Sequence, residues 1–118
     1  MIRIYTFTYA GDAQEAVACV RCARTALPEA VVTVVDDSAA PVPPEARRAL
    51  VAYGARYRRS SFPRCGNLRG PECVRGIIAT LAKGAEDGDT VVKIDSDTAL
   101  LSGGWVRDMQ HNGLALHA

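Results

Sequence analysis

The sequence has few of the features that mark membrane proteins or nucleic-acid-binding proteins. It contains no apolar run close to the ~20 residues of a membrane span, and its N-terminus, MIRIYTFTY, lacks the form of a signal peptide. Its formal net charge is only +1, so no broad electrostatic field draws it to nucleic acid or to an anionic membrane. We therefore expect a cytoplasmic protein with no membrane span and no nucleic-acid partner.

Cysteine and histidine are also scarce, with four and two residues respectively. Cys19 and Cys22 form a CxxC pair inside a helical pattern, and no second pair follows, which favours small buried side chains over zinc or redox chemistry. Cys65 and Cys73 flank a loop, and a reducing cytosol argues against a disulfide between them. The two histidines lie near the end of the chain, and the sequence does not support either as a metal ligand.

The common nucleotide-binding signatures are missing as well. Neither GxxxxGK[ST] nor GxGxxG is present, which excludes P-loop and Rossmann dinucleotide sites. The loop after the first predicted strand reads TFTYAGD, without the run of glycines expected of a nucleotidyltransferase. The composition, 48% hydrophobic and 23% charged over 118 residues, is that of one globular domain covering residues 1–118.

Hydrophobic periodicity predicts alternating strands and helices. Strands are expected at 2–9, 30–35, 55–62 and around 91–94, and helices at 13–27, 45–54 and 71–85. Asp12 is expected to cap the first helix, Gly54 to follow the second, and Pro71 to open the third. The order predicts an α/β fold, a three-layer α/β/α sandwich with a mostly parallel sheet. The arginines of the third strand predict a position near a sheet edge or a ligand.

The stretch DTVVKIDSDTALL carries the strongest functional signal. Val91, Val92 and Ile94 predict a buried strand that ends in Asp95 and Asp97, whose side chains would project to the same side of an extended chain. Two such carboxylates suit Mg²⁺ or Mn²⁺. Aspartate and serine also favour turns at strand ends, so turn formation is the alternative interpretation.

Other polar residues follow the first and second predicted strands. In parallel α/β sheets, ligands bind outside the carboxyl ends of the strands. Thr8 and Tyr9 follow the first strand, Asp36 and Asp37 follow the second, and the acidic pair follows the fourth. The sequence therefore predicts one site at this edge of the sheet.

The motifs FTY, VVDDS, GNLRGP and KIDSDT occur in an order that resembles a known family. Across residues 2–106 the chain is similar to the nucleotide-binding half of the nucleotide-diphospho-sugar transferases, the GT-A fold glycosyltransferases, especially family 2-like members. This resemblance implies a Rossmann-like half-fold and a nucleotide-sugar donor, most often a UDP-sugar. It also implies Mn²⁺ or Mg²⁺ held by a DxD motif.

The resemblance assigns roles to individual residues. It implies Asp97 as a direct metal ligand and Asp95 as a contact to the ribose or, through water, to the metal. It implies that Asp37 hydrogen-bonds the base and that Phe7 and Tyr9 line the base pocket. The start of the third helix would bind an anion, and the residues expected to reach the base or phosphates there are Asn67 and Arg69.

Two functions follow from the resemblance. One is a metal-dependent glycosyltransferase, minimal or truncated, that transfers the sugar to an unknown acceptor. The other is a catalytically inactive nucleotide-sugar-binding or assembly module, because only residues 98–118 follow the DxD, ending in LSGGWVRDMQHNGLALHA, and neither Asp108 nor His111 is assigned as a base. Missing C-terminal strands would leave a sheet edge that a second copy of the chain would cover in a homodimer.

A haloacid dehalogenase-type phosphatase is a further alternative with a DxD motif. That chemistry places the pair on the first strand in the pattern DxDxT/V. Here the pair follows the fourth strand, and Ala99 occupies the last position of the pattern. The pattern therefore disfavours a phosphatase.

Overall fold

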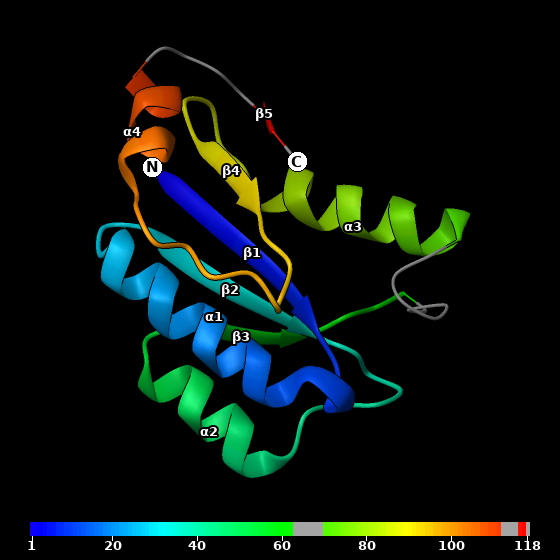
Figure 1. Cartoon of the computed structure of the whole chain (residues 1–118). Coiled ribbons are helices and arrows are strands. Elements are labelled where there is room, and N and C mark those ends of the chain that lie inside the picture. Colours follow the sequence, from blue (N-terminus) through cyan, green and yellow to red (C-terminus); the bar gives the residue numbers. More distant parts are fainter. Residues whose placement is uncertain (63–69, 112–115, 118) are drawn as a thin grey trace.

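The computed structural model describes residues 1–62, 70–111 and 116–117. Strands and helices alternate along most of this chain (Figure 1). The strands are β1 (Ile2–Thr8), β2 (Val31–Asp36), β3 (Arg56–Arg59), β4 (Thr90–Lys93) and β5 (Leu116–His117). The helices are the 3₁₀ turn η1 (Ala10–Asp12), α1 (Ala13–Ala26), α2 (Pro44–Ala52), α3 (Pro71–Gly84) and α4 (Gly104–His111).

The strands form one parallel sheet in the order β3-β2-β1-β4-β5. Strand β1 lies at the centre and pairs with β2 from Arg3 opposite Val31 to Thr8 opposite Asp36. The predicted parallel α/β architecture is confirmed. The arginine-rich β3 lies at an edge, as its composition indicated, and the short β5, which was not predicted, pairs with β4.

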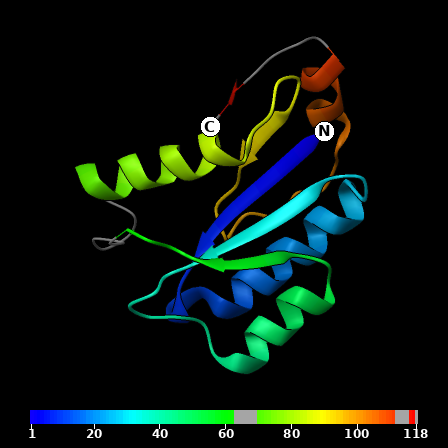
Figure 2. The same cartoon turned by 180° about the vertical axis from the view of Figure 1, so that it is seen from behind.

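Helices cover both faces of the sheet and produce three layers (Figures 1 and 2). On one face, α1, α2 and α4 enclose the larger core, which includes Ile4, Val34 and Val106. On the other face, Tyr5 and Phe7 pack beneath α3 in a smaller cluster. Because successive side chains of a strand point to opposite faces, the nearly fully buried strand β1 supplies both cores, with Ile2 and Ile4 in the larger and Tyr5 and Phe7 in the smaller.

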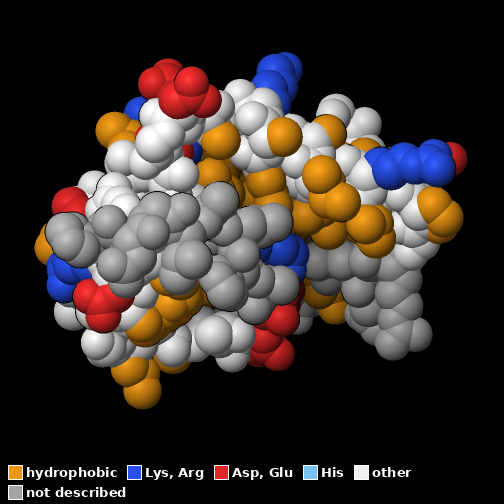
Figure 3. Space-filling model, turned by 90° about the horizontal axis from the view of Figure 1, so that it is seen from above, with side chains coloured by type: hydrophobic (Ala, Val, Ile, Leu, Met, Phe, Trp, Pro, Cys, Tyr) orange, Lys and Arg blue, Asp and Glu red, His pale blue; other side chains and the backbone are white. Residues whose placement is uncertain are grey.

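Helix α3 keeps an apolar strip on its outer side. Val74 and Ile78, one helical turn apart, are 47% and 60% exposed. Figure 3 shows hydrophobic side chains gathered along this helix, on the right of the view. The remaining apolar positions of the helix, Ile77 and Leu81, pack against the smaller core.

The helix boundaries follow the predicted signals in two cases and differ in one. Pro71 stands at the start of α3, and Gly54 follows α2 with a φ of 93°, a left-handed conformation that glycine adopts without strain. The prediction that the Asp12 side chain caps α1 is wrong. Asp12 occupies the cap position, but its carboxylate accepts no hydrogen bond from the helix backbone ahead of it.

The DxD segment differs in local conformation from the prediction. Strand β4 ends at Lys93, and the Thr98 N–H donates to the Asp95 carbonyl oxygen over 2.9 Å. Asp95 to Thr98 therefore form a turn, so the strand alternation used to place the two carboxylates does not extend to them. The segment therefore has the turn conformation of the alternative interpretation, and the metal assignment of its carboxylates stays a prediction.

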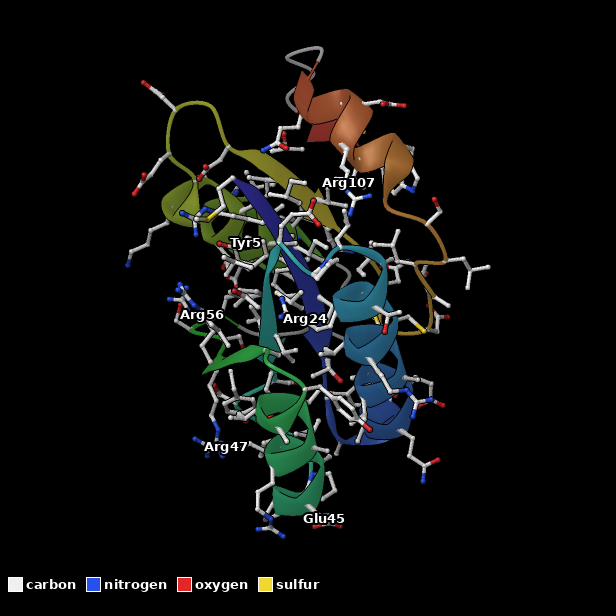
Figure 4. All side chains as sticks on the ribbon, turned by 90° about the vertical axis from the view of Figure 1, so that its left-hand side faces the viewer. Tyr5, Arg24, Glu45, Arg47, Arg56 and Arg107 are labelled. Atoms are coloured by element: carbon white, nitrogen blue, oxygen red, sulfur yellow. The ribbon has the colours of Figure 1, made fainter. Side chains whose placement is uncertain are left out.

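Helix α4 packs beside the C-terminal end of α1. Gly103 precedes it and lies so close to Leu27 that a Cβ at this position would be 2.4 Å from a Leu27 methyl carbon. Arg107 of α4 donates two hydrogen bonds to the Glu29 carboxylate, over 2.8 and 3.0 Å. This ion pair holds α4 against the loop between α1 and β2 (Figure 4).

Two further predictions concern the cysteines and membrane-spanning helices. Cys19 is buried and Cys22 half-buried on α1, as expected of packing side chains, while Cys65 lies outside the described residues. Within the described ranges, no helix combines the length and apolar character that a membrane crossing requires.

Candidate functional site

A small pocket opens at the carboxyl ends of β1 and β2. Its lining includes Phe7, Asp37 and Phe62. The rings of Phe7 and Phe62 lie 6.3 Å apart at an interplanar angle of 53°. Asp36 also lines this pocket, whose volume is only about 10 Å³, so a flat ring would have to lie over its mouth beside Phe62 and Asp37 and not inside it.

The tandem aspartates after β2 have different surroundings. The Asp36 carboxylate is fully buried and accepts hydrogen bonds from the Val42 N–H and the Tyr57 hydroxyl. Burial and this neighbouring carboxylate both raise the pKa of Tyr57. Asp36 therefore fixes the start of the β2–α2 connection, and Arg47 of α2 covers the Tyr57 ring at 4.4 Å (Figure 4).

Asp37 instead faces the pocket. Its backbone N–H donates to the Thr8 carbonyl oxygen over 3.0 Å and extends the β1–β2 ladder by one residue. Its Oδ1 accepts the Ala39 N–H over 3.0 Å, a turn that orients the carboxylate. Both aspartates line the pocket, and of the two Asp37 is 9% exposed while Asp36 is fully buried.

The DxD turn exposes its two carboxylates and buries the residue between them. Asp95 and Asp97 are exposed, whereas Ser96 is only 8% exposed. Lys93, the last residue of β4, donates to Asp95 Oδ1 over 2.9 Å. Among the described residues, Asp97 has no ion pair of this kind.

Lys93 links the acidic turn to the aromatic pocket. Its Nζ lies 6.0 Å from the centroid of the Phe7 ring and, at the same time, bonds Asp95. The Asp95 carboxylate and the Phe7 pocket therefore share one rim of the sheet. The Lys93 ammonium group would also attract an anion bound between Asp95 and the Phe7 pocket.

Asp12 forms a second link, from the end of β1 to the DxD turn. Its Oδ1 accepts hydrogen bonds from the Thr8 hydroxyl and from the Tyr9 N–H, the latter over 3.0 Å. Its Oδ2 accepts the Ser96 hydroxyl over 2.6 Å. Three donors from two separated segments thus converge on one carboxylate.

Cys19 of α1 lies beneath the same turn. Its thiol donates to the Asp95 carbonyl oxygen over 3.7 Å. The pKa of Cys19 is raised to about 11, chiefly by burial and in smaller part by the charges of Asp95 and Asp97. A protonated, buried thiol serves packing here, because the thiolate is the nucleophilic and metal-binding form.

The residues of the turn fit a hard divalent cation. In the part of the chain that the structure describes, no group of three or more acidic, histidine or cysteine side chains gathers as a metal cage. Mg²⁺ is usually held by one or two carboxylates together with substrate phosphates, so a cage is not required. The exposed Asp97 carboxylate fits the role of direct ligand, and Asp95, engaged by Lys93, fits an outer one.

Three further residues were predicted for the site: Tyr9, Asn67 and Arg69. The Tyr9 ring lies against Gly11, where a Cβ would be 2.5 Å from ring atoms, rather than among the described residues lining the Phe7 pocket. Asn67 and Arg69 lie outside the described residues. Asp108, on α4, is exposed.

Sequence reasoning missed three residues of this rim: Phe62, Lys93 and Asp12. Phe62 was assigned to the end of a strand, and only the packing of its ring on Gly76 of α3 brings it to the pocket. The signal for Lys93 was present, because it lies only two residues before Asp95 in the sequence.

No protein-family model and no curated protein matches the chain. Among solved structures, the chain is similar to the crystal structure of an active-site mutant of LgtC, a glycosyltransferase with the GT-A fold. The two share 18% sequence identity, with a TM-score of 0.54. The match covers 85% of this chain and 39% of LgtC.

This likeness establishes a glycosyltransferase-like fold. At this level of identity it shows the fold alone. The chain spans about two-fifths of the length of LgtC, so the activity of a whole transferase is a matter for the proposal that follows.

Proposed function

We propose that residues 1–118 form one domain that binds a nucleotide-diphosphate sugar, a UDP-sugar, as the donor half of a glycosyltransferase. The observation that carries this proposal is the shared rim. An aromatic pocket with the Asp37 carboxylate and an exposed pair of carboxylates, Asp95 and Asp97, lie at one edge of the sheet. Lys93 contacts both parts.

The pocket suits the base of the nucleotide. Phe7 is only 4% exposed, so the half-buried Phe62 is the ring that a base would contact, and a carboxylate matches the N–H group on the edge of uracil. Ala39 engages Asp37 Oδ1, so Asp37 Oδ2 is the oxygen we assign to the base. Tyr9, whose ring lies against Gly11, is not assigned to the base.

The acidic turn suits the diphosphate. Asp97 would hold Mn²⁺ or Mg²⁺, and Asp95 would contact the ribose or the outer shell of the ion. When bound, such an ion offsets the negative charge that develops on the departing nucleotide. Asn67 and Arg69, in the segment before α3, are proposed to contact the base or the phosphates.

The reaction we propose is transfer of the sugar to an acceptor hydroxyl. The bond from the sugar to the β-phosphate oxygen breaks, a bond to the acceptor oxygen forms, and the nucleotide diphosphate leaves. The chain's own contribution is binding and orientation, which lower the barrier by fixing the donor. No general base is assigned: the exposed Asp108 lies on α4, which packs against the loop before β2, and His111 is the last residue of the same helix.

A second candidate is a donor-binding or assembly module without catalysis. The observation favouring it is the Lys93 ammonium, which already pairs with Asp95, one of the two carboxylates of the turn. A module of this kind would act with a second copy or with another chain. A homodimer would contact the edge formed by β5 or by β3, the two outer strands of the described sheet.

Calorimetric titration with UDP and Mn²⁺ tests the proposal. The parent chain is expected to bind UDP in a manner that requires the metal, and Asp97→Ala is expected to weaken binding by about tenfold or more, equivalent to ~1.4 kcal/mol. Asp87→Ala is the matched control, because Asp87 is an exposed aspartate in the turn before β4, at the other end of the strand. Equal heats for the parent and Asp97→Ala would overturn the metal assignment.

Turnover separates the two candidates. Release of UDP from a UDP-sugar, catalysed by the parent chain and lost in Asp97→Ala, would support the enzyme. Metal-dependent binding without release would support the module. Measurement of the molar mass in solution tests the homodimer.

A further inference from the structure

Asp12 is the structural connection between the two halves of the proposed site. It lies at the end of η1, directly after β1, and three hydrogen bonds converge on its carboxylate. Two come from Thr8 and Tyr9, at the end of the strand that also carries Phe7. The third comes from Ser96, 84 residues away in the sequence.

The Ser96 contact decides which way the DxD turn faces. Ser96 is 8% exposed, and its hydroxyl reaches inward to Asp12 Oδ2 over 2.6 Å. With the middle residue anchored inward, the flanking Asp95 and Asp97 are both turned to solvent. The other described contacts of the turn are the Lys93 ammonium on Asp95 Oδ1 and two that involve backbone atoms, the Thr98 N–H and the carbonyl oxygen that the Cys19 thiol meets.

Asp12 does not fit the role of a metal ligand itself. Its two oxygens already accept three hydrogen bonds, and no cluster of three acidic residues forms at this point among the described residues. A carboxylate offers about four lone-pair positions, so most of its capacity is used within the protein. Its contribution is therefore geometric.

We propose that Asp12 is a positioning residue, which acts through Ser96 to hold the DxD carboxylates at a fixed place relative to the base pocket. This inference rests on the proposed function. A nucleotide diphosphate must reach from the Phe7 pocket to the carboxylates with its base and its phosphates bound at once, so the relative placement of the two parts sets the affinity. The Asp12–Ser96 hydrogen bond fixes that placement.

The test compares Ser96→Ala, Asp12→Ala and the double variant. UDP binding is measured by calorimetry with Mn²⁺, and immobilisation of Mn²⁺ by electron paramagnetic resonance in the presence of UDP. A hydrogen bond to a charged group supports an effect of about tenfold in the dissociation constant. Ser96→Ala is expected to weaken UDP binding about tenfold, to reduce the immobilised Mn²⁺ signal and to leave the far-UV circular dichroism unchanged.

The double variant provides the evidence for coupling. If Asp12 acts through Ser96, the two substitutions together weaken binding no more than the larger single effect. Ser102→Ala is the matched control, because Ser102 lies in the loop before α4 and its hydroxyl contacts only the Gly104 N–H, over 3.4 Å, among the described hydrogen bonds. Ser96→Ala, which removes one hydroxyl, keeps the test valid if Asp12→Ala does not fold.

The outcomes are distinguishable. A parent chain that binds UDP and Mn²⁺, with Ser96→Ala within twofold of it, would overturn the positioning role and leave the proposed function standing. Fully additive effects in the double variant would also overturn it. A parent chain that gives no heat with UDP and Mn²⁺ would overturn the proposed function and, with it, this inference.

Discussion

Replacement by alanine is expected to have different effects at the two adjacent aspartates at the end of β2, lowering mainly stability at Asp36 and mainly UDP binding at Asp37. Asp36→Ala removes a fully buried carboxylate that bonds the Val42 N–H and the Tyr57 hydroxyl. Each hydrogen bond to a charged group contributes about 1.5–3 kcal/mol, and relief from burying the charge offsets part of the loss. We expect the free energy of unfolding to fall by about 3 kcal/mol.

Asp37→Ala removes a carboxylate with one hydrogen bond, to the Ala39 N–H within its own turn. We expect it to lower the free energy of unfolding by less than about 1 kcal/mol and to weaken UDP binding instead. Urea denaturation, followed by the fluorescence of Trp105, the single tryptophan, measures stability. Calorimetry with UDP measures binding.

A third variant identifies the cause of the stability loss. Tyr57→Phe removes one of the two partners of Asp36 and is expected to cost about 1–2 kcal/mol. In that background Asp36→Ala should cost less than it does in the parent chain, because the two residues share a hydrogen bond. A loss below about 1 kcal/mol for Asp36→Ala, or a large stability loss for Asp37→Ala, would refute this division of roles.

Three further predictions concern pH and packing. The bonds from Arg107 hold the pKa of Glu29 at about 2, below its ordinary 4.5, so this ion pair stabilises the fold above pH 4.5 and is lost as the pH falls toward 2. The stability difference between the parent and Glu29→Gln should therefore shrink between pH 5 and pH 2, and a constant difference would contradict it. Burial raises the pKa of Cys19 from 9.0 to about 11, so stability should fall as the pH rises from 9 to 11, by up to ~1.4 kcal/mol per pH unit, and Cys19→Ala should lose that component of the slope. Gly76→Ala would place a Cβ 2.2 Å from Phe62 Cγ, so it should displace this ring and weaken UDP binding, and unchanged binding would exclude the ring from the site.

The sequence was sufficient to predict the layers and the rim. The β-branched runs of β1, β2 and β4 and the helical stripes between them determine a parallel sheet, because each pattern depends on neighbours a few residues apart. The same local reasoning placed Asp37 and the DxD pair beyond strand ends. Those predictions concern positions along the chain, which periodicity describes well.

Contacts between distant segments were not predictable in this way. The patterns around Asp12 indicated a helix cap, but its carboxylate serves Thr8 and Ser96, and the latter is 84 residues away. Ser96 looked like a spacer between two acids, and its burial depends on that contact. Hydrogen bonds between side chains of distant segments depend on three-dimensional packing, which hydrophobic periodicity does not describe.

The two aspartates after β2 illustrate the same limit. Both follow the same hydrophobic run, and nothing in VVDDS indicates which of them is fully buried. The structure separates them because Tyr57, on the neighbouring strand β3, offers a hydroxyl to Asp36 alone. The Tyr57–Asp36 hydrogen bond forms because β3 lies beside β2 in the sheet, and the local residue pattern does not give that strand order.

The most direct test of the central claim is a crystal structure of the chain grown with UDP and Mn²⁺. The account predicts the uracil ring in the Phe7 pocket beside Asp37, with the ion in contact with Asp97 and the diphosphate. A nucleotide bound elsewhere, or an ion that avoids the DxD turn while the base occupies the pocket, would contradict it.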